Sequence, residues 1–259
     1  MFTYPITTSA PSYVSAFDDA VAALSPDAYY SFQDASYATQ INDLSGNDYH
    51  LISQLTNPAN TVSPIRSSVA KACQTIGATG GATWPDNASH YETATTDISV
   101  NHISSQTKIC VQFSIRTTST VSVADMRCFF SGYNEASTYG IGCYLVNGNN
   151  YMRIQIKNTA SQYATTTVVA NDGVGHILTL ASDDVANTLK GYFDGVEIIS
   201  STTYTMNAGL TFPLTMGGHL NLNYATQSFE TDHFSLWGGT IPSAAQIIDM
   251  QDKYLAELP

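Results

Sequence analysis

Residues 176–200 read HILTLASDDVANTLKGYFDGVEIIS, and this stretch decides the fold because three successive strands can be recognised in it. Residues 176–181 carry Leu178 and Leu180 on one face, 189–193 carry Leu189 and Phe193 on one face, and 196–200 is apolar and β-branched. Alternation with a period of two is typical of half-buried strands. The stretch therefore predicts three antiparallel strands with a shared apolar face, which a second sheet has to cover.

Both turns of this meander are marked by their residues. Asp183, Asp184 and Asn187 favour the first turn, because Asp and Asn side chains hydrogen-bond to the nearby backbone. Asp194-Gly195 favours a two-residue hairpin, because glycine accepts the positive φ that such a turn requires. Strands and turns therefore agree on one antiparallel meander.

Strand patterns continue outward from the meander on both sides. The clearest, residues 108–116, places its isoleucines, Val111 and Phe113 on one face. Further strands are predicted at 28–32, 50–52, 72–76, 81–84, 126–131, 139–146, 151–157, 164–170, 214–217 and 229–237. About a dozen short strands at this spacing favour an all-β sandwich.

Two short helices flank the strands. Residues 12–24 carry apolar side chains at helical spacing and end before Ser25-Pro26, which predicts an amphipathic helix. Near the C-terminus, Ser243 and Gln246 form a capping box, and an apolar stripe follows that should pack beside the sheets. The stripe consists of Ile247, Met250, Tyr254 and Leu258.

Short motifs also occur in a fixed order along the chain. AYYSF at 28–32 precedes NDLSGN at 42–47, and FSLW at 234–237 precedes IPSAAQI at 241–247. Between them, the meander carries Gly-Tyr-Phe, Asp-Gly and Val-Glu-Ile-Ile. In order and spacing, over about residues 24–255, these motifs resemble the laminin G-like, concanavalin A-like jelly-roll domains.

This resemblance implies an all-β fold, an antiparallel two-sheet jelly-roll β-sandwich with a short N-terminal helix and a C-terminal helix. We expect residues 1–25 to form an N-terminal arm with the short helix, and residues 26–259 to form the sandwich domain. The arm should dock on the sandwich, with docking to a partner as the alternative. The resemblance implies a binding function and does not imply a catalysed reaction, because such folds host many functions.

The charge balance excludes some classes of partner. The 259 residues include 9 basic and 21 acidic ones, which gives a net charge of −12. Such a chain repels phosphate backbones and anionic membranes, so we expect no nucleic acid as a partner. Only 12% of the residues are charged, and a surface rich in Ser, Thr, Asn, Gln and Tyr suits neutral polar partners.

The N-terminal sequence predicts no secretory signal peptide, because no Lys or Arg precedes Arg66 and no uninterrupted apolar segment follows the first residues. No run approaches the ~18 apolar residues that would span a bilayer. We therefore expect a protein made in the cytoplasm without membrane insertion.

Catalysis is not expected. A glycoside hydrolase on this fold needs two carboxylates across the cleaved bond, ~5 Å apart in a retaining enzyme. The nearest pattern is FETDHF, in which Glu230 and Asp232 supply two acids of an E-x-D-x-x-E or E-x-D-x-E motif and the third is missing. We therefore predict no catalytic residues.

Metal sites and disulfides are not expected either. The six His residues are dispersed, without the spacing of a zinc site. Calcium stays open as an alternative at two oxygen-rich clusters, although turn chemistry alone explains them. The clusters are Asp43, Asn47 and Asp48, and Asp183 with Asp184. The four Cys residues, at 73, 110, 128 and 143, favour free buried thiols, with a Cys128–Cys143 bridge as the alternative.

Tyrosine is the residue type that most suggests a ligand. The chain has 16 Tyr, and aromatic faces with a hydroxyl suit sugar rings. Tyr133, Tyr139, Tyr163 and Tyr224 lie in or beside predicted loops and are the candidate glycan contacts. Trp84 and Trp237 are predicted to be core residues.

The resemblance extends to virion proteins of tailed bacteriophages, because the short helical segment precedes the Ala-Tyr-Tyr-Ser-Phe strand and no leader is recognisable. It implies a non-enzymatic virion protein that adheres to host glycan or decorates the capsid or tail. The implied partners are other virion proteins or host surface polysaccharide, and a homo-oligomer is compatible with this. The alternative is a secreted-type carbohydrate-active enzyme or its carbohydrate-binding module.

Overall fold

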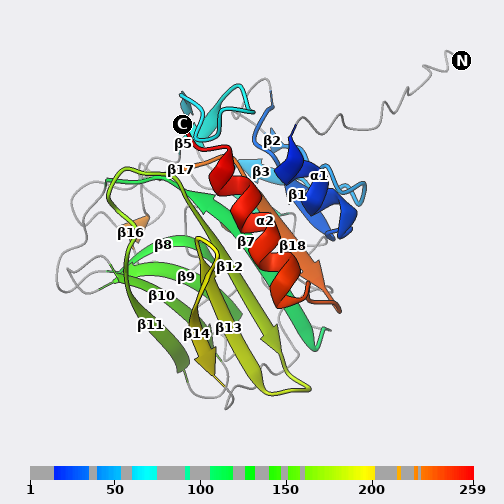
Figure 1. Cartoon of the computed structure of the whole chain (residues 1–259), viewed down its shortest axis with the longest axis vertical. Helices are drawn as coiled ribbons and strands as arrows, with labels where there is room; N and C mark the ends of the chain where they lie inside the picture. The colour runs from blue at the N-terminus through cyan, green and yellow to red at the C-terminus, as the bar shows by residue number, and fades with distance from the viewer. Residues whose placement is uncertain are drawn as a thin grey trace, which may run out of the picture.

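The predicted meander forms one half of a six-stranded sheet in the computed structural model (Figure 1). The structure describes residues 15–34, 40–53, 60–74, 91–93, 106–118, 126–131, 140–146, 151–157, 161–201, 215–216, 225–226 and 229–259. The meander consists of β12 (His176–Asp183), β13 (Thr188–Phe193) and β14 (Val196–Ser201). The sheet continues from β12 through β7 (Lys108–Ile115) and β18 (Phe234–Gly238) to β1 (Ala28–Tyr30).

Both predicted turns are confirmed. Asn187 has a φ of 53°, and at the second turn Asp194 has a φ of 49° and Gly195 one of 80°. Two successive positive φ values are the signature of the hairpin turn whose twist matches the flanking strands. In the first turn, Asp183 Oδ1 accepts hydrogen bonds from the N–H groups of Val185 and Ala186, each at 3.0 Å.

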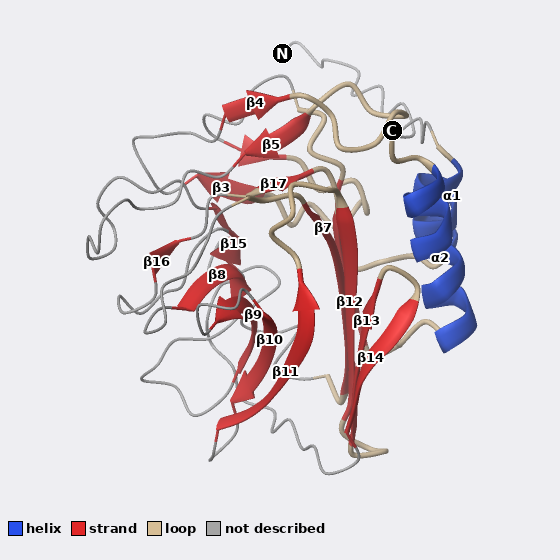
Figure 2. Cartoon of the chain, turned by 60° about the vertical axis from the view of Figure 1, so that its left-hand side comes forward, coloured by secondary structure: helices blue, strands red, loops and turns tan. Residues whose placement is uncertain are grey.

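A nine-stranded sheet faces the first one, and a small third sheet lies beside them (Figure 2). The order in the nine-stranded sheet is β11 (Ser161–Val169), β10 (Tyr151–Lys157), β9 (Gly140–Val146), β8 (Met126–Ser131), β15 (Thr215–Met216), β6 (Tyr91–Thr93), β3 (Leu51–Ser53) and β2 (Gln40–Ile41). The small sheet contains β17 (Glu230–Thr231), β5 (Ala72–Gln74) and β4 (Asn60–Val62). Within this sheet, β8 pairs antiparallel with β9. One pairing departs from the antiparallel prediction, because β16 (Ala225–Thr226) runs parallel to β8.

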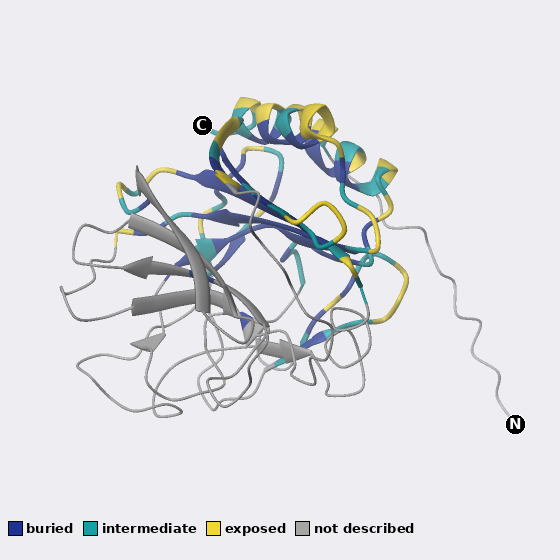
Figure 3. Cartoon of the chain, turned by 90° about the horizontal axis from the view of Figure 1, so that it is seen from below, coloured by how far each residue is buried: buried dark blue, intermediate teal, exposed yellow. Residues whose placement is uncertain are grey.

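Two hydrophobic clusters hold the layers together. The first lies between the two large sheets and takes the side chains that alternate inward, such as Phe113, Leu178 and Leu236. The second lies on the outer face of the six-stranded sheet, under α1 (Ala16–Ala23) and α2 (Ala244–Ala256). Figure 3 shows the buried sides of both helices turned toward this sheet.

The helices change the prediction for the meander in one respect. The sequence predicts one buried face, whereas β12 is buried on both, from His176 to Ser182. Leu178 and Leu180 face the second sheet, while Ile177 and Ala181 lie under the helices. The predicted apolar stripe of α2 supplies this cover, with Ile247, Met250 and Tyr254 buried and Leu258 beyond the helix end.

The predicted strand at 229–237 is interrupted. Its first part, β17, pairs with β5, and its second part, β18, pairs with β1 and β7. The break falls at Asp232 and His233, because the Asp232 carboxylate turns inward to Arg66. Within the described part of the predicted 12–24 segment, the N-terminal helix begins at Ala16, where Ser15 caps it by accepting the N–H of Asp18.

Some predictions lie outside the described residues, among them the arm at 1–11, the strand at 81–84 and Trp84. Trp237 is confirmed as a core residue, with 1% of its surface exposed. Cys73, Cys110 and Cys143 are buried free thiols. The alternative Cys128–Cys143 bridge is therefore absent.

Candidate functional site

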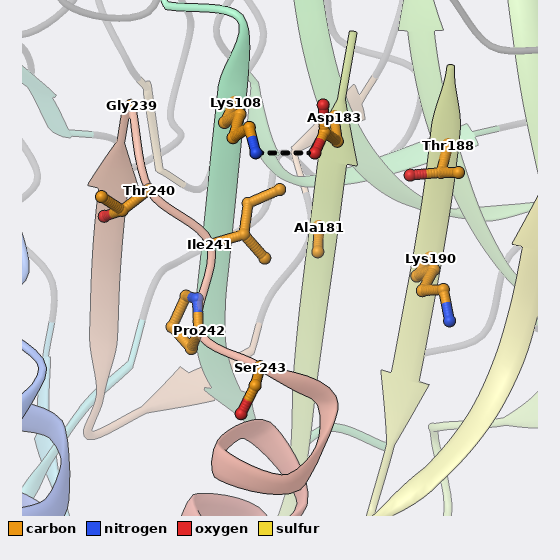
Figure 4. Close-up of a pocket in the computed structure, with 10 residues that line it drawn as sticks. All are labelled: Lys108, Ala181, Asp183, Thr188, Lys190, Gly239, Thr240, Ile241, Pro242 and Ser243. Atoms are coloured by element: carbon orange, nitrogen blue, oxygen red, sulfur yellow. Dashed lines mark ion pairs between the residues drawn. The ribbon is translucent and has the colours of Figure 1, made fainter. Parts of the chain in front are cut away.

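A groove of about 430 Å³ opens on the outer face of the six-stranded sheet, beside the start of α2 (Figure 4). We call it the Lys108 groove. Its walls come from β7, β12, β13 and the loop 239–243. The lining includes Lys108, Asp183, Thr188, Lys190, Ile241 and Ser243.

The register of the sheet creates this groove. Lys108 and Asp183 are direct cross-strand partners on β7 and β12. Both side chains point to the face that the helices cover elsewhere, because side chains in a strand alternate. The helix α2 begins only at Ala244, so this end of the sheet stays open to solvent.

Two ion pairs supply polar groups at the groove. Lys108 Nζ lies 3.0 Å from Asp183 Oδ2, and Lys190 Nζ lies 3.1 Å from Glu197 Oε2. Burial opposes ionisation of Asp183, but the N–H of Ala186 and the Lys108 ammonium outweigh it and lower its pKa. The hydrogen bond that Lys190 donates to Glu197 lowers the pKa of Glu197 and raises the pKa of Lys190. Asp183, Lys190 and Glu197 are therefore held in their charged forms at neutral pH.

The remaining lining combines hydroxyl groups with apolar surface. Thr240 and Ser243 are exposed, whereas Ile241 and Pro242 form an apolar side wall. Ser243 accepts the N–H of Gln246 and keeps its own hydrogen to donate. Donors, acceptors and apolar surface in one groove suit a ligand rich in hydroxyl groups.

A second depression, of about 200 Å³, lies at the other end of β7, and we call it the Glu230 pocket. Its lining includes Gln74, Arg116, Thr118, Gly173, Phe229 and Glu230. The Arg116 guanidinium pairs with the Glu230 carboxylate. Glycoside hydrolysis needs two acids, and Glu230 is the one carboxylate among the described residues that line the pocket.

Asp232, the other acid of the predicted FETDHF pattern, is fully buried in a different environment. Arg66 Nε lies 3.3 Å from Asp232 Oδ2, and Arg66 Nη1 lies 3.3 Å from Asp18 Oδ1 and 3.1 Å from Glu257 Oε2. Burial lowers the pKa of Arg66, but Asp232 and Asp18 outweigh it and raise it. Asp232 therefore stabilises the fold, and it does not converge with Glu230 on a ligand.

None of the predicted glycan contacts is among the described residues that line the groove or the pocket. Tyr133, Tyr139 and Tyr224 lie outside the described residues. Tyr163 belongs to β11, where its backbone pairs with Gln155, and its side chain is not among those described.

One acid of each oxygen-rich cluster, Asp43 or Asp183, accepts hydrogen bonds within its turn. Asp43 accepts the N–H groups of Tyr29 at 2.9 Å, Ser45 at 2.9 Å and Tyr49 at 3.1 Å. Asp183 is held by Lys108 and by its own turn. Within the described part of the chain, no group of three His, Cys, Asp or Glu could hold a metal ion.

The Lys108 groove was not predicted from the sequence. The charged residues that line it are Lys108, Asp183 and Lys190, which come from three strands and meet only through register. One sequence feature pointed toward the groove, since Lys190 is the one charged residue of the predicted strand 189–193. A single lysine does not identify the residues that it meets in the fold.

No protein-family model matches the chain, and no curated protein matches it. Within the described residues, no helix is both long and apolar enough to cross a membrane.

Solved structures match over most of the chain. The binding domain of botulinum neurotoxin DC, solved in complex with rat synaptotagmin II, superposes with a TM-score of 0.63 and 13% identity over 88% of this chain and 51% of that one. A structure of botulinum neurotoxin type C, a toxin whose cell entry is described as dependent on two ganglioside molecules, superposes with a TM-score of 0.63. The identity is 11% over 87% of this chain and 50% of that one. The chain thus spans about half the length of these neurotoxin chains.

A third structure matches over nearly its whole length. Domain 4 of an extracellular GH43 arabinanase from Geobacillus stearothermophilus, in complex with arabinotriose, superposes with a TM-score of 0.61 and 15% identity over 88% of this chain and 98% of that one. At these identities the likeness is one of fold. The chain is a jelly-roll β-sandwich of the same architecture as these binding domains.

Proposed function

We propose that the chain is a non-catalytic carbohydrate-binding module and that the Lys108 groove binds a neutral saccharide. The observation that carries the proposal is the pairing of Lys108 with Asp183 beside the hydroxyls of Thr240 and Ser243. Ammonium groups donate hydrogen bonds and carboxylates accept them, so adjacent sugar hydroxyls can be matched in both directions. Ile241 offers apolar surface for the C–H face of the sugar.

The composition and the neighbouring structures support a neutral glycan. Each Lys at the groove is already paired, so the site offers no uncompensated charge to an ionic ligand. Among the structural neighbours, the arabinanase domain was solved with arabinotriose, which is a neutral oligosaccharide. The neurotoxin whose cell entry depends on gangliosides supports a glycan ligand only in general. A binding role is also supported by the Glu230 pocket, which has a single carboxylate among its described lining.

The test is calorimetric titration of the full chain with neutral oligosaccharides and with host surface polysaccharide, comparing Asp183→Asn and Lys190→Gln with the wild type. Loss of a charge-assisted hydrogen bond should weaken binding by roughly 10-fold to 100-fold. Lys253→Gln is the control, because Lys253 pairs with Asp249 on α2, away from the groove. Equal binding by all variants contradicts the groove, and release of sugars from the polysaccharide contradicts a non-catalytic role.

Tyr133, Tyr139, Tyr163 and Tyr224 remain proposed glycan contacts. Their replacement by alanine in the same titration separates the contribution of these tyrosines from that of the Lys108 groove. If only the tyrosine variants lose affinity, the saccharide binds at the loops and the Lys108 groove is not its site.

A narrower setting, the surface of a tailed-phage virion, is proposed from the resemblance of the sequence motifs. There the module would attach to host polysaccharide or to other virion proteins. Mass spectrometry of purified particles tests this setting. Absence of the chain from particles that assemble normally contradicts it and leaves the saccharide titration unaffected.

A further inference from the structure

The Glu230 pocket and the Lys108 groove lie at the two ends of one strand. Lys108 begins β7, and Arg116 follows its last residue. The two residues are an even number of positions apart, so their side chains share the outer face of the sheet, roughly 26 Å from each other at ~3.3 Å per residue. Between them Cys110, Gln112 and Ser114 are buried, so the pocket and the groove are separate.

The polar groups of the Glu230 pocket are fixed in place. Arg116 donates to Glu230, to the carbonyl of Pro64 at 3.1 Å and to the carbonyl of Ser63 at 2.9 Å. Gln74 Nε2 donates to Glu230 Oε1 at 3.3 Å. Phe229 also lines the pocket, but it is 2% exposed and belongs to the core cluster between the two large sheets. The pocket therefore presents a carboxylate and an amide in a set geometry.

One wall of the pocket is the loop 171–175, which contributes Gly173. The N–H of Gly173 donates to the carbonyl of Thr117 at 3.1 Å. Asp172 Oδ1 accepts the N–H of Val174 at 2.8 Å and lies 3.0 Å from His176 Nε2. The loop is thus tied to β12 through the imidazole ring of His176.

The other ring nitrogen of His176 meets a second carboxylate. His176 Nδ1 lies 2.6 Å from Asp194 Oδ2, and Asp194 Oδ1 accepts the N–H of Ile177 at 2.9 Å. The ring packs on Phe193 with centroids 4.8 Å apart. Only the doubly protonated imidazolium donates to both carboxylates at once. In that form His176 joins the pocket wall to the β13–β14 turn.

We propose that the Glu230 pocket is a second ligand site for a single neutral sugar unit or a similar polyol, and that His176 is the positioning residue that holds its wall. A volume of about 200 Å³ suits one such unit. The Glu230 carboxylate accepts hydrogen bonds from adjacent hydroxyls, and Gln74 supplies an amide. The proposal extends the proposed function, since the same class of ligand occupies a second place.

The charge of His176 gives this site a pH dependence. The carboxylates facing the ring are Asp172 from the loop and Asp194 from the hairpin, with Asp252 of α2 beside the same turn at Gly195. Burial lowers the pKa of His176, but the hydrogen bond to Asp194 and then that to Asp172 outweigh it and raise it above 6.5. The pair contacts are therefore complete below pH ~6.5 and are lost as the pH rises through the raised pKa.

The site is tested by NMR titration of the full chain with the methyl glycosides of glucose, galactose, mannose and N-acetylglucosamine. We expect saturable shifts of the Gly173 backbone amide and the Gln74 side-chain amide, weakened at least tenfold in Glu230→Gln. Asp183→Asn, which alters only the Lys108 groove, should leave these shifts unchanged. Absence of shifts at Gly173 with all four glycosides overturns the proposal, whether or not the groove binds.

The role of His176 is tested by repeating the titration at about pH 6 and about pH 9. We expect the wild type to bind at least threefold more weakly at the higher pH and His176→Asn to show no such difference. His50→Asn, remote from the pocket, serves as the matched control and should keep the wild-type difference. Equal affinity of the wild type at both pH values, or an unchanged pH dependence in His176→Asn, overturns this role.

Discussion

At the scale of single residues, Arg66 joins parts of the chain that are far apart in sequence. Its guanidinium contacts Asp18 of α1, Asp232 between β17 and β18, and Glu257 after α2. It also lies over the rings of Phe17 and Tyr254, 4.7 and 5.4 Å from their centroids. Replacement of Arg66 by a neutral residue therefore leaves the buried carboxylates of Asp18 and Asp232 without this cationic partner.

We expect Arg66→Met to lower the free energy of unfolding by about 3–5 kcal/mol, because breaking a buried ion pair from one side strands the other charge. Urea denaturation measures this. Lys253→Met removes a cation from an exposed pair and should change stability by less than about 1 kcal/mol. Similar effects of the two variants contradict the role of Arg66.

His233 has the opposite pH behaviour to His176. Burial and then the charge of Arg66 lower its pKa well below 6.5, and its Nδ1 has no hydrogen-bond partner among the described residues. Because the unfolded chain binds this proton more readily, stability should fall as the pH drops below ~6.5, by at most about 1.4 kcal/mol per pH unit.

The His233→Phe variant keeps the ring contacts with Phe17 and Tyr29 and removes the titrating group. Urea denaturation at several pH values between about 5 and 7 should give a shallower slope for this variant than for the wild type. His50→Gln is the control and should keep the wild-type slope. An unchanged slope in His233→Phe contradicts the assignment.

Sequence reasoning could not find these contacts. Arg66 and Asp232 are separated by 166 residues, and no local pattern connects them. The same holds for the cross-strand pair of Lys108 and Asp183, which depends on register. Residues that act on their own neighbours, such as Asp43 and Asp194 in their turns, could be predicted, because Asp and Gly act through the local backbone.

At the scale of elements, local signals predicted well. The meander was placed correctly because each of its strands and turns carries its own pattern. The capping box of α2 is confirmed, with Ser243 and Gln246 bonded reciprocally. The strand at 229–237 was predicted as continuous because its break is imposed by Arg66, a distant residue.

Ser243→Ala should destabilise the protein by about 1 kcal/mol, because the N–H of Gln246 loses its acceptor. For a chain of this size that corresponds to a fall of roughly 2–4 °C in the midpoint of thermal unfolding. Gln246→Glu keeps the capping box and should stay close to the wild type. A midpoint unchanged in Ser243→Ala would show that the first turn of α2 is held by packing alone.

At the scale of the whole molecule, the fold class was predicted and the number of layers was not. The helices form a layer of their own, with Phe17, Val21 and Tyr254 fully or almost fully buried against the six-stranded sheet. A periodic apolar stripe indicates that a helix packs against another element. It does not indicate which face of which sheet the helix covers, because that depends on the arrangement of the strands.

Phe17→Ala should lower the free energy of unfolding by about 3–5 kcal/mol, because removal of a buried aromatic ring leaves a cavity.

Trp237 donates its indole N–H to the carbonyl of Leu24 at 3.1 Å, so its fluorescence reports the docking of α1. In a Trp84→Phe background, unfolding followed by fluorescence and by circular dichroism should coincide. A fluorescence transition that precedes the circular dichroism transition would show that the helices detach first. Val185→Ala, at an exposed turn, is the control for Phe17→Ala and should leave the free energy of unfolding nearly unchanged.

The position of β18 has a consequence for how the chain folds during synthesis. This strand lies between β1 and β7 in the sheet, although the ribosome makes it long after both. Until it emerges, β1 has no neighbour in that sheet and β7 presents an open edge, which is prone to pair with other chains. Completion of the sheet therefore waits for the C-terminal segment, and nascent chains that stall before residue 234 should depend on chaperones.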